Sequence, residues 1–236
     1  MVQYSLKEGL ITRYDRMQLE DLLIKFSPER IIETLSFFLT EERKVRIDQV
    51  LEKRVKGVQV ALEAPADIHN ALAVTRTGEA LGVYQFHLID AQLIKGQGKA
   101  TMRGSSRWIH LYRHNTLEVF RSKMKGFILA GASLDGELTL EELPKDRPLC
   151  LLFGNERKGL TSEAKAMCDL LYHIPMVGMV ESFNLSVSAG LSLYQMMRGK
   201  AEGDLNHEEQ LEEKARYYVR SIGIKVAHDI LQRSRQ

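Results

Sequence analysis

The spacing of hydrophobic residues changes twice along the chain and divides it into three parts. Up to residue 56, apolar residues recur with the spacing of amphipathic helices. From Val58 to Met176, short β-rich apolar runs take over, and beyond Gly199 the chain turns polar before a helical pattern returns. We therefore expect a helical extension over residues 1–56, a core domain over 57–200 and a C-terminal helix over 201–236 that begins after Asn206.

The first part carries start signals for three helices. Residues 14–26 form the first helical pattern, and Ser27 followed by Pro28 is a cap with a first-turn proline for a second helix through Leu39. Thr40 can cap the third helix. This part lies outside the core domain, and binding a substrate, bracing a dimer and merely extending the fold all fit it.

The third helix, over residues 41–56, has an apolar side and a basic side. We expect Val45, Val50 and Leu51 to face a core, and four cations to occupy the remaining surface: Arg43, Arg46, Lys53 and Arg54. A solvated helix of mixed charge and a face that contacts phosphates fit these cations equally well.

The middle part has the rhythm of a parallel α/β sheet. Six short β-rich runs alternate with helical or loop segments: 58–62, 84–89, 108–112, 127–130, 149–153 and 171–175. This alternation predicts an α/β domain whose parallel sheet has helices on both faces. Ligands gather at the carboxyl ends of such strands, which here lie at Gly131, Gly154 and Ile174. A G-x-G-x-x-G stretch does not follow the first strand, which argues against a dinucleotide site.

The stretch from Ile174 to Gln195 combines a strand end, a loop and a helix start. Ser182 and Asn184 are both good helix N-cap residues, so each can satisfy backbone amides or turn toward a ligand. The helix that follows is rich in small residues, namely Ser186, Ser188, Ala189, Gly190 and Ser192. Such a helix allows another backbone to approach closely, and we expect it to form a homodimer interface.

Composition limits the class of protein without naming a partner. The chain has 236 residues, 44% of them hydrophobic and 27% charged, as expected for a folded globular protein. Its net charge of +2 is too small to demonstrate a nucleic-acid partner. We find no apolar run near the roughly 18 residues of a membrane helix and no signal-peptide core, so we expect a cytoplasmic protein with no membrane partner. Cys150 and Cys168 fit reduced interior thiols, and we expect no metal site.

Three separated stretches resemble the motifs of one enzyme family. Residues 69–76 read HNALAVTR, residues 151–160 read LLFGNERKGL, and residues 174–194 read IPMVGMVESFNLSVSAGLSLY. In this order and spacing they resemble the three motifs of SPOUT methyltransferases, specifically the TrmH-type RNA ribose 2′-O-methyltransferases. The likeness covers roughly residues 43 to 200, and three ordered motifs are far more specific than any one of them.

The resemblance implies more about fold and cofactor than the pattern does. It implies a C-terminal trefoil knot in the core, whose loops bind S-adenosylmethionine. It also implies a set of cofactor-binding residues: Gly131, Gly154, Ile174, Met176 and Phe183. Gly131 departs from the family, where threonine is frequent at that place; a side-chain contact to the cofactor is then missing, while a backbone contact remains.

The catalytic residues that the resemblance implies are Arg76, Asn70, Glu156, Ser182 and Asn184. Methyl transfer to a ribose 2′-hydroxyl is an in-line displacement that needs two aligned substrates and an outlet for a proton. We expect Arg76 to be essential and to hold a phosphate beside the target ribose. Because a guanidinium keeps its proton at neutral pH, the route of the 2′-hydroxyl proton stays open.

Each of these residues also has a purely structural interpretation. Arg76 fits an ordinary surface cation, Ser182 and Asn184 fit helix caps, and Glu156 fits a carboxylate that caps a helix starting near Thr161. Residues 99–108 form a loop with three cations and Trp108, which resembles an RNA-facing loop of the family but also fits a mobile loop whose tryptophan fills the core.

The resulting functional prediction is an S-adenosylmethionine-dependent 2′-O-methyltransferase whose RNA partner is a tRNA, with a guanosine of the D-loop as target. Two alternatives stay open. The chain could methylate ribosomal RNA, or it could be a non-catalytic RNA-binding member of the same fold.

Overall fold

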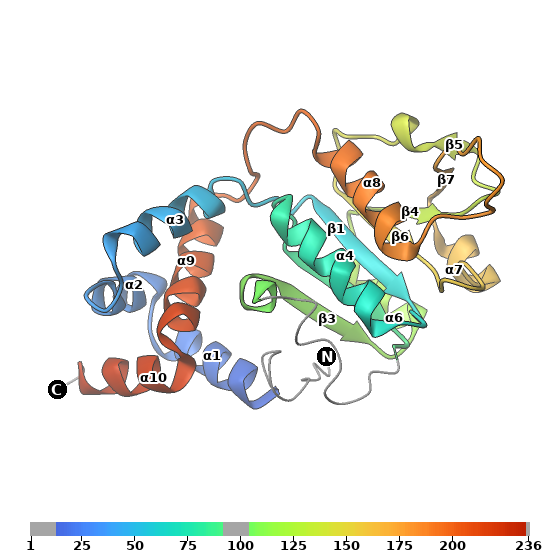
Figure 1. Cartoon of the computed structure of the whole chain (residues 1–236). Coiled ribbons are helices and arrows are strands. Elements are labelled where there is room, and N and C mark those ends of the chain that lie inside the picture. Colours follow the sequence, from blue (N-terminus) through green and yellow to red (C-terminus); the bar gives the residue numbers. More distant parts are fainter. Residues whose placement is uncertain (1–12, 92–103, 235–236) are drawn as a thin grey trace. The chain divides into compact units, whose positions relative to one another are not determined.

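The computed structural model describes residues 13–91 and 104–234, which fall into two compact units. One unit is the α/β domain of residues 55–200, and the other contains the helices before residue 55 and after residue 200. The N-terminal and C-terminal extensions therefore belong to one helical unit (Figure 1).

The helical unit begins with the three helices that the sequence predicts. These are α1 (Arg13–Lys25), α2 (Pro28–Ser36) and α3 (Glu41–Leu51). The Ser27 hydroxyl caps α2 by accepting a hydrogen bond from the Arg30 amide at 3.3 Å, and the Thr40 hydroxyl accepts one from the Arg43 amide at 3.3 Å at the start of α3. Both predicted caps are confirmed, because these hydroxyls satisfy amides that lack a partner within their helices.

The prediction of a single C-terminal helix is wrong. The chain forms α9 (His207–Ile222) and α10 (Ile224–Arg233), and Gly223 separates them with a φ of 103°. A residue with a side chain rarely adopts that φ, so the glycine permits the break. Asn206 caps α9 as expected, through a capping box with Glu209.

Two expectations about α3 are also wrong. Val45 is 53% exposed, while Ile47 and Leu51 face the core, because positions four apart share one helical face. Arg54 is buried rather than exposed, and its Nε donates a hydrogen bond to the Tyr217 hydroxyl at 3.0 Å. The helix predicted over residues 41–56 also ends at Leu51, so Lys53 and the buried Arg54 lie beyond α3, and its basic side is smaller than the sequence suggested.

The α/β domain contains one parallel sheet in the order β3-β2-β1-β6-β4-β7-β5 (Figure 1). Its strands are β1 (Val58–Glu63), β2 (Gln85–Ile89), β3 (His110–His114), β4 (Ile128–Ala132), β5 (Leu138–Thr139), β6 (Leu149–Phe153) and β7 (Leu170–His173). Six of them correspond to the predicted runs, and the parallel arrangement is confirmed. The third run begins later than expected, because Trp108 belongs to the 3-10 helix η1 (Ser105–Trp108). The part of the loop before residue 104 lies outside the described residues.

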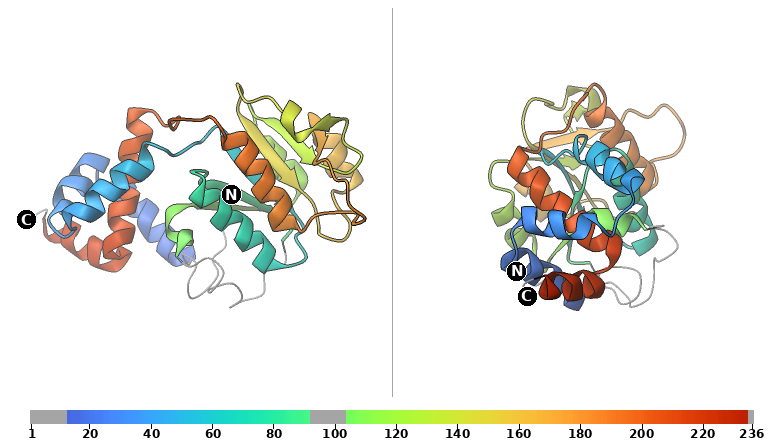
Figure 2. Two further views of the ribbon diagram at one scale, coloured as in Figure 1. Left: turned by 45° about the horizontal axis from the view of Figure 1, so that its top comes forward. Right: turned by 90° about the vertical axis from the view of Figure 1, so that its left-hand side faces the viewer.

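Helices cover both faces of this sheet, as predicted. On one face lie α4 (Ile68–Ala80) and α8 (Leu185–Met197), which run side by side in Figures 1 and 2. On the other face, Phe120 of α6 (Leu117–Lys123) and Ala164 of α7 (Ser162–Met167) pack in one hydrophobic cluster with Ala61 and Leu152 of the central strands. Every residue of β1 and β6 is buried as a result.

The small residues of α8 pack against α4 of the same chain. Ala189 is fully buried, and a Cβ added to Gly190 would lie 3.7 Å from the Thr77 methyl group. Gly78 of α4 has no room for a Cβ, which would come within 2.6 Å of the Phe86 ring. The close backbone approach that these residues predict is therefore made within the chain, and it does not by itself indicate a dimer.

A buried polar chain crosses β1, β2 and β3 on the face that α6 covers. His87 lies 2.8 Å from Gln59 Oε1 through its Nε2 and 2.9 Å from His114 Nε2 through its Nδ1. The Phe120 ring packs against both imidazoles. Burial, with a smaller contribution from His114, lowers the pKa of His87 to about 3, so this imidazole is neutral at physiological pH.

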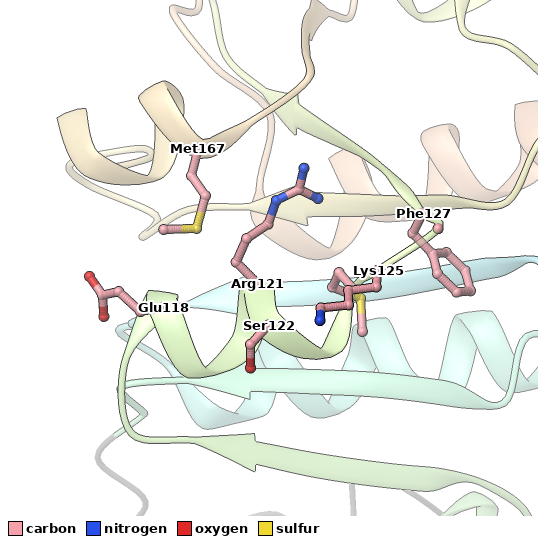
Figure 3. A pocket seen from close by; sticks show the side chains of 8 residues that line it. Glu118, Arg121, Ser122, Lys125, Phe127 and Met167 are labelled. Carbon is pink, nitrogen blue, oxygen red and sulfur yellow. The ribbon is translucent and has the colours of Figure 1, made fainter.

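A hollow of about 470 Å³ lies near the amino end of β4, between α6 and Met167, and Figure 3 shows Lys125 and Phe127 among its residues. Within residues 13–91 and 104–234, the helices are too short or too polar to cross a membrane.

Candidate functional site

A pocket of about 440 Å³ opens at the carboxyl ends of β4, β6 and β7. The ends of these three strands and the loops after them supply most of its wall, through residues 132–135, 153–160, 172–174 and 176. Residues 181–183 line it as well, just before α8 begins. This is the edge of a parallel sheet at which ligands gather. The sequence also predicts a ligand site at this edge, from the strand ends at Gly131, Gly154 and Ile174.

The loop after β6 is a tight turn that requires glycine. A Cβ on Gly154 would lie 2.1 Å from the Gly159 carbonyl carbon, and Gly159 itself has a φ of 69°. Asn155 fixes the turn, because its Oδ1 accepts hydrogen bonds from the amides of Arg157 and Lys158 at 3.0 and 3.3 Å. Its Nδ2 donates to the Ala64 carbonyl at 2.8 Å, which ties the turn to the end of β1. The turn is thus held in one shape without a ligand.

Glu156 projects from this turn to the start of α4. One carboxylate oxygen accepts a hydrogen bond from the Ala66 amide at 2.7 Å, and the other accepts from the Asp67 amide at 3.2 Å and from Asn70 Nδ2 at 3.1 Å. The expectation that this carboxylate caps the helix near Thr161 is wrong, because the Thr161 hydroxyl caps α7 itself. Glu156 instead binds the chain at the entry to α4.

Asn70 and Asn184 continue this contact into α8. Asn184 Oδ1 accepts hydrogen bonds from the Ser186 amide at 2.8 Å and its hydroxyl at 2.7 Å, so the Asn184 Nδ2 is left to donate to Asn70 Oδ1 at 3.3 Å. Asn70 Nδ2 then faces Glu156. The backbone donor at Ser186 and the carboxylate at Glu156 fix both amide orientations. We name Asn184, Asn70 and Glu156 the amide relay.

The amide relay joins one residue from each of the three motifs. Asn70 and Glu156 are 86 residues apart in sequence, and Asn184 lies 114 residues from Asn70. The structure thus shows Asn184 both as the N-cap of α8 and as a partner of Asn70. Its capping role and its site role are compatible.

Five of the other predicted site residues line the pocket: Gly154, Ile174, Met176, Ser182 and Phe183. Gly131 does not line it and lies within β4, where a Cβ would come within 2.7 Å of the Cys168 sulfur and 2.9 Å of Leu160. Its successor Ala132 does line the pocket. Packing of the strand therefore accounts for a glycine at position 131.

Arg76 makes no hydrogen bond with the amide relay. It sits on α4 two turns beyond the helix start, its side chain is exposed, and it is not among the residues that line the pocket. Within the described part of the chain it makes no ion pair or hydrogen bond through its guanidinium. It is an exposed cation that is free to bind an anionic partner.

The structure adds a loop that sequence reasoning missed. In the segment after β4, Asp135 accepts hydrogen bonds from the Ser133 hydroxyl and from Lys165 Nζ at 2.9 Å, and these contacts, the first more than the second, lower its pKa to about 2. His173 Nδ1 lies 2.9 Å from the Gly136 carbonyl, which ties this loop to the end of β7. Ser133, Asp135 and Lys165 all line the pocket. The only signal for this loop in the sequence is the presence of Ser133 and Asp135 directly after the run that forms β4.

The cysteines take no part in the site. Cys150 is buried in β6, and burial raises the pKa of its thiol far above the usual range. Burial also raises the pKa of Cys168 to about 12. Both thiols stay protonated at neutral pH and are poor nucleophiles.

Comparison with known proteins supports one family. The model of the SpoU rRNA methylase family matches residues 57–194, more than half of the chain. A tRNA (guanosine(18)-2′-O)-methyltransferase of Borreliella burgdorferi is 32% identical over 194 residues, which cover 79% of this chain and 89% of the relative.

Two solved structures have the same fold. The TrmH/SpoU tRNA modifying enzyme of A. aeolicus superposes with a TM-score of 0.63 at 26% identity, over 82% of this chain and 97% of that one. An AdoMet-bound rRNA methyltransferase of Sinorhizobium meliloti superposes with a TM-score of 0.55 at 27% identity, over 62% of this chain and 58% of that one. With the matched segment spanning the whole sheet and all three motifs, the chain belongs to the SpoU rRNA methylase family.

Proposed function

We propose that this protein is an S-adenosylmethionine-dependent tRNA 2′-O-methyltransferase that modifies the ribose of a guanosine in the D-loop. The observation that carries the proposal is the amide relay, which joins the three motifs beside a pocket of about 440 Å³. The two similar proteins that match most of this chain, over 79% and 82% of it, are named a tRNA (guanosine(18)-2′-O)-methyltransferase and a TrmH/SpoU tRNA modifying enzyme, which supports tRNA over ribosomal RNA as substrate.

The pocket fits the proposed cofactor in size and in chemistry. Its volume lies within the range of about 300–1,000 Å³ that is usual for small-molecule sites. Gly154 and Gly159 line the pocket, and the place that a Gly154 side chain would take is filled by the backbone of Gly159 and Leu160, so the turn can offer backbone groups to a ligand. Glu181 lines the same pocket without a side-chain partner in the described part of the chain, so it offers a negative charge to a cationic cofactor. When bound, S-adenosylmethionine supplies an electrophilic methyl group on its sulfonium.

In the proposed reaction the chain's residues position groups rather than form bonds. Glu156 has three hydrogen-bond donors on its carboxylate, so we assign it to holding the turn against α4 instead of relaying a proton. Asn184 and Asn70 fix the start of α8 relative to α4, and Ser182 presents a hydroxyl to the pocket two residues before the relay. We assign Arg76 to the phosphate beside the target ribose, where its guanidinium neutralises charge and aligns the 2′-hydroxyl for attack.

We also propose that the protein is a homodimer. Val187, Leu191 and Tyr194 are 46%, 41% and 62% exposed and lie on one face of α8. The loop before α8 adds Val177 and Met179, whose side chains are fully exposed. Apolar residues gathered on one face indicate a protein interface. A second copy docked here would bring exposed Arg76, on the helix packed against α8, toward a neighbouring pocket.

Two further parts of the proposal concern the core and its surroundings. The pocket loops after β6 and β7 form the C-terminal trefoil knot that the resemblance implies, which fits their convergence on one pocket with the loop after β4. The helical unit holds the tRNA or braces the dimer. The enzyme works in the cytoplasm, where tRNA is found.

The test is transfer of labelled methyl groups from S-adenosylmethionine to purified tRNA and, separately, to ribosomal RNA. We expect incorporation into tRNA. Arg76→Ala should abolish this incorporation while cofactor affinity stays unchanged, because Arg76 does not line the pocket. Incorporation into ribosomal RNA alone would show that ribosomal RNA, and not tRNA, is the substrate. Full activity of Arg76→Ala would show that Arg76 has no role in the reaction.

A further inference from the structure

The cations around the pocket differ in one respect, namely whether an acidic side chain already neutralises them. Lys165 lines the pocket and is paired with Asp135 at 2.9 Å. Arg157 and Lys158 also line the pocket, yet their side chains make no ion pair or hydrogen bond with the described residues. Two adjacent unpaired cations at the rim of a pocket indicate an anionic partner that comes from outside the chain.

The turn that carries these two cations is already rigid. Asn155 and Gly159 exchange backbone hydrogen bonds at 3.0 and 2.8 Å, and Asn155 Oδ1 accepts from the amides of both Arg157 and Lys158. Glu156 lies between the strand end and these cations in sequence, but its carboxylate is engaged at the start of α4. The turn therefore directs one acidic side chain inward and leaves two basic side chains exposed. A partner that binds them has little backbone ordering to overcome.

The chemistry of the proposed substrate places an anion at this rim. In RNA the 2′-hydroxyl lies on the carbon next to the 3′-carbon, whose oxygen carries a phosphate. Any ribose that presents its 2′-hydroxyl to the pocket must therefore bring a phosphate to the edge of the pocket. An arginine can bind two phosphate oxygens with its planar fork, and a neighbouring lysine adds a mobile point charge.

We propose that Arg157 and Lys158, at the pocket, bind RNA backbone phosphates that flank the target ribose, in addition to the phosphate assigned to Arg76. The inference rests on the proposed function, since it assumes that RNA is the substrate. It separates two tasks on the protein surface: Glu181 and the pocket wall face the cofactor, while the two cations of the turn hold the RNA backbone. It also gives a role in substrate binding to the two residues of the second motif that stand between Glu156 and Gly159.

The variants that test this are Arg157→Gln, Lys158→Gln and the double variant, all in the full chain. Lys125→Gln is the matched control, because Lys125 is an exposed lysine of the same domain that lies near the opposite end of the sheet, at the hollow in Figure 3. Binding of tRNA is measured by fluorescence anisotropy over a series of salt concentrations, and binding of S-adenosylmethionine by calorimetry.

We expect each single variant to weaken tRNA binding about 10-fold at low salt and to reduce the slope of log K against log salt by about 0.7–0.9, the effect of losing one phosphate contact. The affinity of these variants for S-adenosylmethionine should match that of the wild type. The Lys125→Gln control should match the wild type in tRNA affinity and in salt slope. An unchanged salt slope, or a parallel loss of cofactor affinity that would assign the cations to the cofactor carboxylate, overturns the inference. If the wild-type protein methylates no RNA, the proposed function fails separately, and the binding series still decides whether these cations contact phosphate.

Discussion

Replacing Asn70 with aspartate tests the amide relay with almost no change in shape. The substitution exchanges an N–H donor for a carboxylate oxygen where Asn70 Nδ2 now lies 3.1 Å from Glu156 Oε1. Two carboxylates would then face each other at the start of α4. Asn70→Ala is the matched variant, because it removes the same contacts without adding a charge.

The structure predicts both the sign and the size of the effect. At an effective dielectric constant of about 20, two unit charges about 4 Å apart repel each other by about 4 kcal/mol. Both side chains are half-buried, so solvent reduces this to about 2–3 kcal/mol. Loss of the hydrogen bonds alone, as in Asn70→Ala, should cost about 1–2 kcal/mol. An aspartate in the first turn of a helix normally stabilises the helix by about 0.3–1 kcal/mol. If Asn70 did not contact Glu156, Asn70→Asp would therefore be more stable than Asn70→Ala.

The assay is urea unfolding of wild type, Asn70→Asp and Asn70→Ala at pH 8 and at pH 5. At pH 8 we expect Asn70→Asp to be the least stable of the three by about 1 kcal/mol or more relative to Asn70→Ala. Carboxyl groups that share a site can share one proton, so acidification should restore Asn70→Asp relative to Asn70→Ala. If Asn70→Asp is as stable as Asn70→Ala at pH 8, or more stable, the contact between Asn70 and Glu156 is refuted.

Three other predictions follow from the fold and the site. Folding lowers the pKa of His87 from its ordinary value of about 6.5 to about 3. Below pH 6.5 the unfolded chain therefore binds a proton at His87 that the folded chain does not, and the free energy of unfolding decreases as the pH falls. Between pH 7.5 and 5.5 the wild type should lose about 1.4 kcal/mol more free energy of unfolding than His87→Gln, measured in urea, and equal losses would contradict the neutral buried imidazole. Gly154→Ala should abolish cofactor binding in calorimetry, since its Cβ would lie 2.1 Å from the Gly159 carbonyl carbon; binding at wild-type affinity would mean that this turn is not part of the cofactor site. Leu191→Glu should convert a particle of twice the 26.9 kDa chain mass into a monomer in light scattering, while a dimer that persists in this variant would exclude the exposed face of α8 as the interface.

The sequence predicted those parts of the fold that depend on local pattern. Six strands, the caps at Ser27, Thr40 and Asn206, and the helix start at Asn184 follow from period and capping chemistry within a few residues. Strand β5 was missed because two residues, Leu138 and Thr139, are too short to show a period. The break at Gly223 was missed because a single glycine in a helical pattern is often tolerated.

Long-range contacts account for the remaining differences. Burial of Arg54 depends on Tyr217, 163 residues away, and nothing in the local sequence distinguishes this arginine from its exposed neighbours. Likewise, the sequence offered Glu156 a nearby helix to cap, and only the tertiary structure shows that its partners lie about 90 residues earlier in the chain, at Ala66 and Asp67. The motif resemblance placed Asn70, Glu156 and Asn184 in one set, and the structure shows that these three are in contact. It did not indicate which members of the set touch, nor that Arg76 makes no hydrogen bond with them.

The most direct test of the proposed activity is a map of 2′-O-methyl groups in tRNA from cells with and without this protein, read at single-nucleotide resolution. We predict that one mark, on the ribose of a D-loop guanosine, disappears without the protein and returns when the wild-type chain is restored, but not when Arg76→Ala is. An unchanged tRNA map, or a mark lost only from ribosomal RNA, would contradict the proposed activity.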